Sequence, residues 1–96
     1  MPKATLLHAE RRLLSSGAIM QARIWLVPEP VPPSTHPLKY SLVYIVGGER
    51  VVGYDNERGK GDHRHYGTCE EPYAFTTPER LMMDFLADVR AAGGDV

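Results

Sequence analysis

The sequence predicts an α+β fold: a four-stranded antiparallel β-meander with a C-terminal α-helix packed on one face. Two observations predict it. Between residues 20 and 54, apolar residues either alternate with polar ones or form short branched runs, as strands with a buried face do. After residue 77, apolar residues recur with helical spacing. The chain of 96 residues is long enough for one core but not two, so we expect residues 1–96 to form a single domain.

Residues 4–14 and 20–27 are predicted to form the first hairpin. In the second segment the apolar residues occupy every other position: Met20, Ala22, Ile24 and Leu26. This alternation is typical of a strand with one buried face. The periodicity of residues 4–14 fits a helix or a strand. The intervening Ser15-Ser16-Gly17 turn favours the strand, because it lets the two segments pair.

Two further strands are predicted after the proline-rich segment 28–37, which we expect to be an extended connector. Tyr40–Val46 is a nearly continuous apolar run, typical of a central strand covered on both faces. Gly47-Gly48 suits a two-residue hairpin turn. Arg50–Tyr54 follows as the fourth strand and leads into a segment rich in charged residues.

The last predicted element is a helix that begins after Thr77. Threonine is a good N-cap, and Pro78 fits the first helical position. Gly93-Gly94 is expected to end the helix. Before it, residues 67–72 are predicted as a polar loop, and Tyr73–Phe75 as a short strand or an extended packed piece. The apolar face of the helix is predicted to hold Met82, Phe85, Leu86 and Val89.

Composition excludes several classes of protein. The formal net charge of −1 gives no general attraction to nucleic acid, so RNA binding requires a local basic patch. Cys69 is the single cysteine, which excludes an internal disulfide and a thiolate metal cluster. No apolar run approaches the roughly 20 residues of a membrane span, and the N-terminus lacks the pattern of a secretory signal. We therefore expect a cytoplasmic protein with no membrane partner.

Titratable residues crowd into one segment, Tyr54–Tyr66 (YDNERGKGDHRHY). Cleavage of RNA by its own 2′-OH needs a base, an acid and cations for the phosphorane charge. His63 and His65 are the predicted base and acid, in either order. Their partners are predicted from the same segment: Lys60 and Arg64 for phosphate charge, Asp62 or Asp55 to orient a histidine, and Arg58 and Tyr66 as further RNA contacts. This chemistry uses no metal and no cofactor.

A regular strand limits how these groups combine. His63 and His65 would point to one face, within about 7 Å of each other. Arg64 would then point to the opposite face, which conflicts with a shared site. Lys60 and Arg58, on a glycine loop, could approach the histidines instead. Tyr66 also faces away, so its predicted role is limited to base stacking.

Two other interpretations of the charged segment remain open. In the first, His63 and His65 bind a metal with Asp55 or Asp62 as the third ligand, although a His-x-His pattern alone is weak evidence. His8 and His36 stand apart from the pair in sequence and are expected to be ordinary surface or half-buried histidines. In the second, the segment is a solvated turn in which Asp55, Asn56 and Asp62 cap backbone amides.

The chain also resembles a known family. The run YDNERGKGDHRHYG, followed by EEPYAFTTPERLMMDFLADV, looks like the TumE family of toxins. The upstream IWLVPEPVPPSTHPLKYSLVYIVGGERVVGYD is similar to that family's Trp-x-x-Pro element, Lys-Tyr strand and hairpin. The resemblance covers about Ile19 to Val89. Lys60, Asp62, His63, Arg64 and His65 occupy its signature positions.

The resemblance implies a toxin of a type II toxin–antitoxin system. Such a toxin is neutralised by a cognate antitoxin that typically carries a helix-turn-helix domain, and it blocks translation or cleaves RNA. The leading hypothesis is therefore a metal-independent endoribonuclease acting on RNA. Its rival is a non-enzymatic subunit that docks the antitoxin or the ribosome. An edge strand together with Met82 and Met83 makes a homodimer a further expectation.

Overall fold

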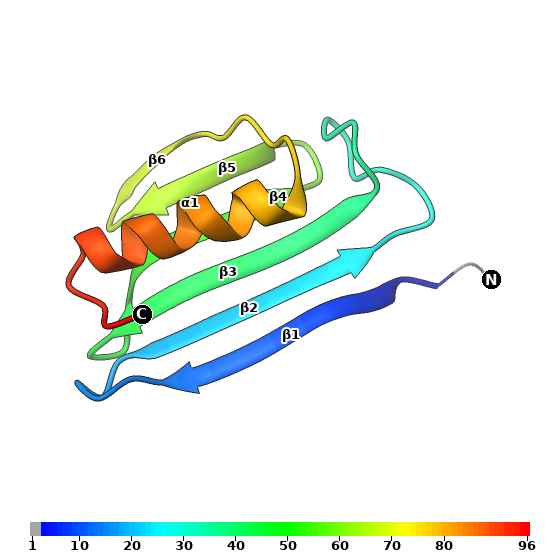
Figure 1. Ribbon diagram of the computed structural model, residues 1–96. Coiled ribbons are helices and arrows are strands. Elements are labelled where there is room, and N and C mark those ends of the chain that lie inside the picture. The colour runs from blue at the N-terminus through cyan, green and yellow to red at the C-terminus, as the bar shows by residue number, and fades with distance from the viewer. Residues whose placement is uncertain (1–2) are drawn as a thin grey trace.

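The computed structural model describes residues 3–96 as an antiparallel sheet with one helix on one face (Figure 1). The six strands lie in the sheet in chain order: β1 (Thr5–Leu13), β2 (Ile19–Leu26), β3 (Leu38–Val46), β4 (Glu49–Glu57), β5 (Gly61–Tyr66) and β6 (Cys69–Pro72). The helix, α1 (Pro78–Ala91), follows. The predicted α+β class, the antiparallel meander and the C-terminal helix are confirmed. The predicted number of strands, four, is wrong.

The two additional strands, β5 and β6, come from segments with no hydrophobic alternation. Polar residues occupy both faces of β5, because its neighbours supply buried partners on each side. All four residues of β6 are exposed, and they pair with β5 from His63↔Pro72 to Tyr66↔Cys69. The polar loop predicted over residues 67–72 is therefore a tight turn and an edge strand.

The predicted hairpins are confirmed. β1 pairs with β2 along nearly its whole length, although most of its residues are exposed, which explains its ambiguous periodicity. Between β3 and β4, Val46 pairs with Glu49, so the connection is the two-residue turn Gly47-Gly48. Both glycines have positive φ, 58° and 79°. This conformation matches the twist of the strands, and residues with a Cβ rarely adopt it.

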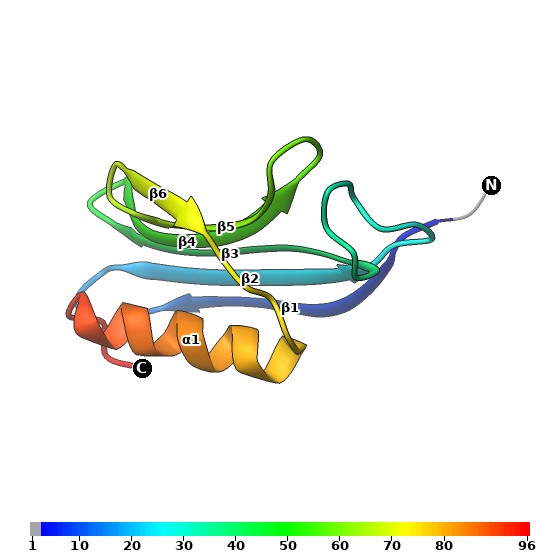
Figure 2. The same cartoon turned by 90° about the horizontal axis from the view of Figure 1, so that it is seen from above.

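The core lies between α1 and the facing side of the sheet, as Figure 2 shows. The sheet side is built from alternate residues of β2, β3 and β4: Met20, Ala22, Ile24, Leu38, Tyr40, Leu42, Tyr44, Val52 and Tyr54. The helix contributes Leu81, Phe85 and Val89, all fully buried. Phe85 and Val89 were predicted and Leu81 was not, while Met82 and Leu86 are partly buried at the margin.

The helix ends match the sequence signals. The hydroxyl oxygen of Thr77 accepts a hydrogen bond from the Arg80 N–H at 3.1 Å, as an N-cap does. Pro78 occupies the first turn. The helix ends at Ala91, and Gly93 has a φ of 95° just beyond it. Across residues 3–96, the structure contains no helix with the length and apolarity that crossing a membrane requires.

The sheet face opposite α1, called here the open face, carries no helix (Figure 2). Because side chains alternate along a strand, residues that neighbour the core positions point to this face. They include Arg23 and Trp25 on β2, Lys39 and Ser41 on β3, Asp55 on β4, and His63 and His65 on β5.

Candidate functional site

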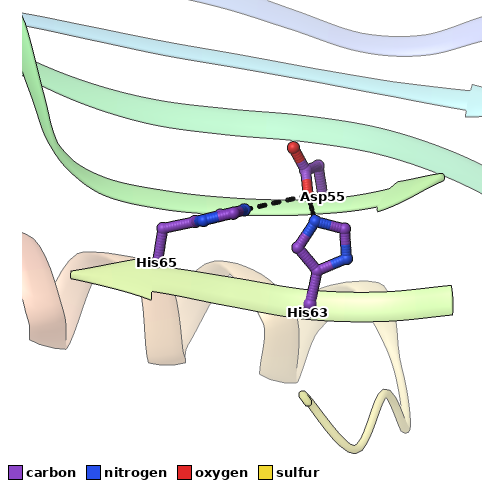
Figure 3. A group of neighbouring side chains, drawn as sticks. All are labelled: Asp55, His63 and His65. Carbon is purple, nitrogen blue, oxygen red and sulfur yellow. Dashed lines mark ion pairs between the residues drawn. The ribbon is translucent and has the colours of Figure 1, made fainter. Parts of the chain in front are cut away.

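Asp55, His63 and His65 form a compact cluster on the open face (Figure 3). Asp55 pairs directly with His63 across β4 and β5, and Gly53 pairs with His65. Both imidazole rings turn toward the Asp55 carboxylate, with their centroids 4.8 Å apart. The prediction that both histidines share one face is confirmed. Of the two carboxylates considered as their partner, the structure selects Asp55.

The cluster is largely shielded from solvent. The side chains of His63 and His65 are 4% and 10% exposed, and that of Asp55 is 20% exposed. Oδ1 of Asp55 lies 2.5 Å from Nε2 of His63 and 3.6 Å from Nε2 of His65. None of these three atoms is aligned for a hydrogen bond with any described residue. Buried polar atoms are rarely left in this state, so the cluster requires an explanation.

A backbone contact defines the tautomer of His63. Its Nδ1 lies 2.9 Å from the carbonyl oxygen of Gly61. A carbonyl only accepts hydrogen bonds, so Nδ1 carries the proton. In the neutral ring, Nε2 therefore carries no proton and lies beside the Asp55 carboxylate.

Glu70 and Lys60 border the cluster on the β6 side. Oε1 of Glu70 lies 3.6 Å from Nε2 of His63, and Oε2 lies 3.9 Å from Nδ1 of His65. Nζ of Lys60 lies 3.6 Å from the same Glu70 carboxylate. Lys60 and His63 line a shallow hollow here, so the predicted cation does approach the histidines. Arg58 is exposed in the turn between β4 and β5.

Asp62 points to the helix side of the sheet, away from the histidine pair. It pairs with Asn56 across the strands, and its carboxylate accepts hydrogen bonds from Ser34, His36 (2.6 Å) and Tyr40 (2.7 Å). Burial alone would raise the pKa of Asp62, but these hydrogen bonds outweigh it and hold that pKa below its ordinary value. The geometry assigns Asp62 to a structural network.

His36 belongs to this network rather than to the cluster. Its side chain is 16% exposed and stacks on Phe75, with ring centroids 3.9 Å apart. Burial, followed by the hydrogen bond to Asp62, raises the pKa of Tyr40 far above its ordinary value. Tyr40 therefore remains a hydrogen-bond donor to Asp62 at neutral pH.

Arg64 and Tyr66 also lie on the helix side, as strand alternation requires. Arg64 pairs with Glu71 and lies 5.2 Å above the ring of Tyr66. Its hydrogen bond to the Tyr54 hydroxyl raises the pKa of Arg64 above its ordinary value. The Tyr66 hydroxyl donates to Asp88 of α1 at 2.6 Å. The expected conflict between Arg64 and the histidines is therefore real.

Asp55 and Asn56 do not form the capping turn considered above, because both lie within β4. Asn56 is buried, with 1% of its surface exposed. Its Oδ1 accepts from the backbone N–H of Tyr40 at 3.0 Å, and its Nδ2 donates to the carbonyl of Leu38 at 2.7 Å. These bonds extend the β3–β4 ladder beyond the last backbone pair, Ser41↔Asp55.

A groove on the open face was not predicted from the sequence. It has a volume of about 500 Å³, and its lining includes Arg23, Trp25, Lys39 and Ser41, with Asp55 at one side. Arg50 lies on the same face, since its side chain packs over Gly53, the partner of His65. The sequence contained a signal for it, because Gln21, Arg23 and Trp25 alternate with the predicted buried residues of β2 and therefore share the opposite face.

The comparisons with known proteins point to one family. A family model described as Toxin TumE matches residues 3–92. No curated protein and no solved structure matches the chain. The family match includes all six strands, the cluster and the helix. The chain therefore belongs to the TumE toxin family.

Proposed function

We propose that this chain is the toxin of a toxin–antitoxin pair and that it cleaves RNA on its open face. Family membership supports the toxin assignment. A toxin of this type needs a cognate antitoxin, which we propose carries a helix-turn-helix domain. The RNA part of the proposal rests on the chemistry of the open face.

One observation supports RNA as the substrate: a groove with cations and an aromatic ring leads to the histidine cluster. Arg23 and Lys39 are exposed in that groove and can contact phosphates, while Trp25 offers a surface for base stacking. Asp55 belongs both to the groove and to the cluster. A single strand bound along the groove would therefore bring a phosphate to the histidines.

The proposed reaction is transesterification within the RNA. The ribose 2′-oxygen attacks the adjacent phosphorus, the bond from phosphorus to the 5′-oxygen breaks, and a 2′,3′-cyclic phosphate forms. The 2′-OH loses one proton and the departing 5′-oxygen gains one, so no water is consumed. His65 is the better placed of the two histidines to contact the phosphate. Nδ1 of His63 is held by the Gly61 carbonyl, whereas Nε2 of His65 has no hydrogen-bond partner within residues 3–96.

Binding can be tested with the fluorescence of Trp25, the only tryptophan in the chain. Single-stranded RNA should quench it, and the Arg23→Ala/Lys39→Ala variant should bind at least about tenfold more weakly with a smaller salt dependence. The matched control is Arg12→Ala/Arg80→Ala. It removes the same charge from exposed positions away from the open face. Equal weakening in both variants would contradict a binding site in the groove.

Cleavage can be tested with purified protein and RNA. Wild type should produce fragments with 2′,3′-cyclic phosphate ends and leave the corresponding DNA intact, since DNA lacks the 2′-OH. His65→Gln should cut at least about 100-fold more slowly and should relieve growth arrest in cells. RNA that stays whole with the wild-type protein would refute the proposal and favour the rival, a subunit that docks the antitoxin or the ribosome.

A further inference from the structure

We propose that Asp55, His63 and His65 bind one divalent transition-metal ion, with Zn²⁺ the best match. This deepens the proposed function, because it names a cofactor for the same cluster. It also replaces the metal-independent chemistry that the sequence pattern favours. The metal site rests on the geometry, charge and donor chemistry of the cluster, and its direct test is metal binding.

The first argument is the state of the donor atoms. Oδ1 of Asp55 and Nε2 of each histidine are buried and make no hydrogen bond within the described chain. The ligand atoms of the three residues all lie within 4.8 Å of one another. A Zn²⁺ ion with bonds of about 2.0–2.2 Å holds its ligands roughly 3.4 Å apart. The separations of 2.5 Å and 3.6 Å from Oδ1 lie on either side of that value, and the two histidine nitrogens lie within 4.8 Å of each other, so side-chain displacements on the order of 1 Å would bring all three ligands to bonding distance.

The second argument is the support of the ligands. A metal-binding histidine usually donates its other ring N–H to a carbonyl or carboxylate, which fixes the tautomer and the ring direction. His63 does this through Nδ1 and the Gly61 carbonyl. Its Nε2 then carries no proton, yet it lies 2.5 Å from the Asp55 oxygen. Two lone pairs at that distance repel each other unless a proton or a cation lies between them.

The third argument is charge. The carboxylates of Asp55 and Glu70 flank both imidazoles, and without a cation they would repel an RNA phosphate. A divalent ion reverses this, because it attracts a phosphate oxygen and offsets the developing negative charge. Glu70 is 40% exposed and also pairs with Lys60, so it can remain outside the coordination sphere. The fourth position of the metal is then left for substrate, as in catalytic zinc sites.

The donor set selects the metal. Two imidazoles and one carboxylate suit Zn²⁺ and its neighbours in the first transition row, whereas Mg²⁺ and Ca²⁺ prefer oxygen donors alone. Cys69 pairs with Tyr66, which points to the helix side, so no thiolate competes at the cluster. Co²⁺ can replace Zn²⁺ as a spectroscopic probe.

The test is direct metal binding by the full chain after removal of bound metal with a chelator. Zn²⁺ should bind with a stoichiometry of about one per chain and should raise the melting temperature, because it binds only the folded state. Co²⁺ should give visible absorption bands in a four- or five-coordinate site. Asp55→Asn and His65→Gln should each weaken binding by at least about 10–100-fold, the loss that changes to outer-shell partners alone produce.

The matched control is His8→Ala, which removes an exposed histidine that lies 4.0 Å from Glu10 on β1. It should bind Zn²⁺ like wild type. The proposal is overturned if wild type does not bind, or if His8→Ala loses as much affinity as the cluster variants. A loss of binding in Asp55→Asn counts only where circular dichroism shows an intact fold.

RNA cleavage separates this inference from the proposed function. Cleavage that persists in a chelator, by a protein that binds no Zn²⁺, would overturn the metal site and leave the endoribonuclease proposal standing. Stoichiometric Zn²⁺ binding without cleavage of any RNA would do the reverse. Cleavage that is lost in chelator and restored by Zn²⁺ would support both.

Discussion

The Tyr40 hydroxyl on β3 donates to Oδ2 of Asp62 on β5 at 2.7 Å, although β4 lies between these strands. Asn56 of β4 is held between them by its bonds to Tyr40 and Leu38. The carboxylate of Asp62 also accepts hydrogen bonds from the side chains of Ser34 and His36, which lie in the proline-rich connector. One buried network therefore joins three strands and a loop on the helix side of the sheet.

Asp62→Asn should reduce stability and leave the cluster chemistry intact. The variant loses a charged acceptor shared by three donors, and we expect a cost of about 2–3 kcal/mol in the free energy of unfolding. Urea denaturation measures it. RNA cleavage and Zn²⁺ affinity, measured well below the melting temperature, should stay within about threefold of wild type. Asp55→Asn is the matched comparison and should show the opposite pattern.

Arg64→Ala should have little effect on RNA binding. Arg64 lies on the helix side, away from the proposed RNA groove, and pairs there with Glu71. A partly exposed ion pair contributes at most about 1 kcal/mol to the free energy of unfolding, so its loss should leave the fold intact. Arg50→Ala removes the same charge from the open face beside His65. It should weaken binding of single-stranded RNA, measured by Trp25 fluorescence at low salt. Weaker binding in Arg64→Ala than in Arg50→Ala would contradict the assignment of RNA to the open face.

Phe85→Ala should be strongly destabilising. Phe85 is fully buried and packs edge-to-face on Tyr54, so its removal leaves a cavity that costs about 3–5 kcal/mol. Met83 lies two residues earlier and is 62% exposed. Met83→Ala should change the free energy of unfolding by less than about 0.5 kcal/mol. Thermal denaturation of the two variants compares the two sides of α1.

Tyr73→Phe should reveal a stabilisation that is lost in alkali. The Tyr73 hydroxyl donates to Asp84 at 2.6 Å, and burial, followed by this bond, raises the pKa of Tyr73 above its ordinary value of 10.0. A raised pKa in the folded state gives stability that is complete below the unfolded pKa and lost as pH rises through the folded one. The stability difference between wild type and variant should therefore be constant below about pH 10 and shrink above it. Denaturation between about pH 8 and about pH 11 measures it, and a difference that grows would contradict the argument.

The sequence predicted those elements whose apolar residues follow a period. The buried face of β2 was identified correctly. β3 was predicted to be covered on both faces, which is wrong, because its burial alternates and only its helix side is fully buried. The face of α1 was identified in part, since Leu81 was missed. β5 and β6 could not be found in this way. β5 is covered on each face by polar partners, and β6 is an exposed edge strand with no buried apolar residue, held by backbone pairs with β5 and by the ion pairs of Glu70 and Glu71.

His63 and His65, predicted to share one face of a strand, do lie together on the open face, and their role as a functional site stays a prediction. The partners of the two histidines were less predictable. Strand alternation places both Arg64 and Asp62 on the face opposite the histidines, although both were kept as predicted site residues, and bringing Asp55 to His63 required the register of β4 against β5. The contact of Glu70 with the histidines could not be predicted either. Glu70 approaches them through the pairing of β6 with β5, and β6 has no hydrophobic pattern.

The helix never contacts the cluster, yet it controls which residues the open face displays. The carboxylate of Asp88 on α1 accepts hydrogen bonds from the hydroxyls of Tyr54 on β4 and Tyr66 on β5. A slip of β5 by a single residue would turn Tyr66 outward and bury the histidines under the helix. Asp88 thus helps to fix the register of β5 against β4. Its hydrogen bonds on the helix side keep His63 and His65 on the open face.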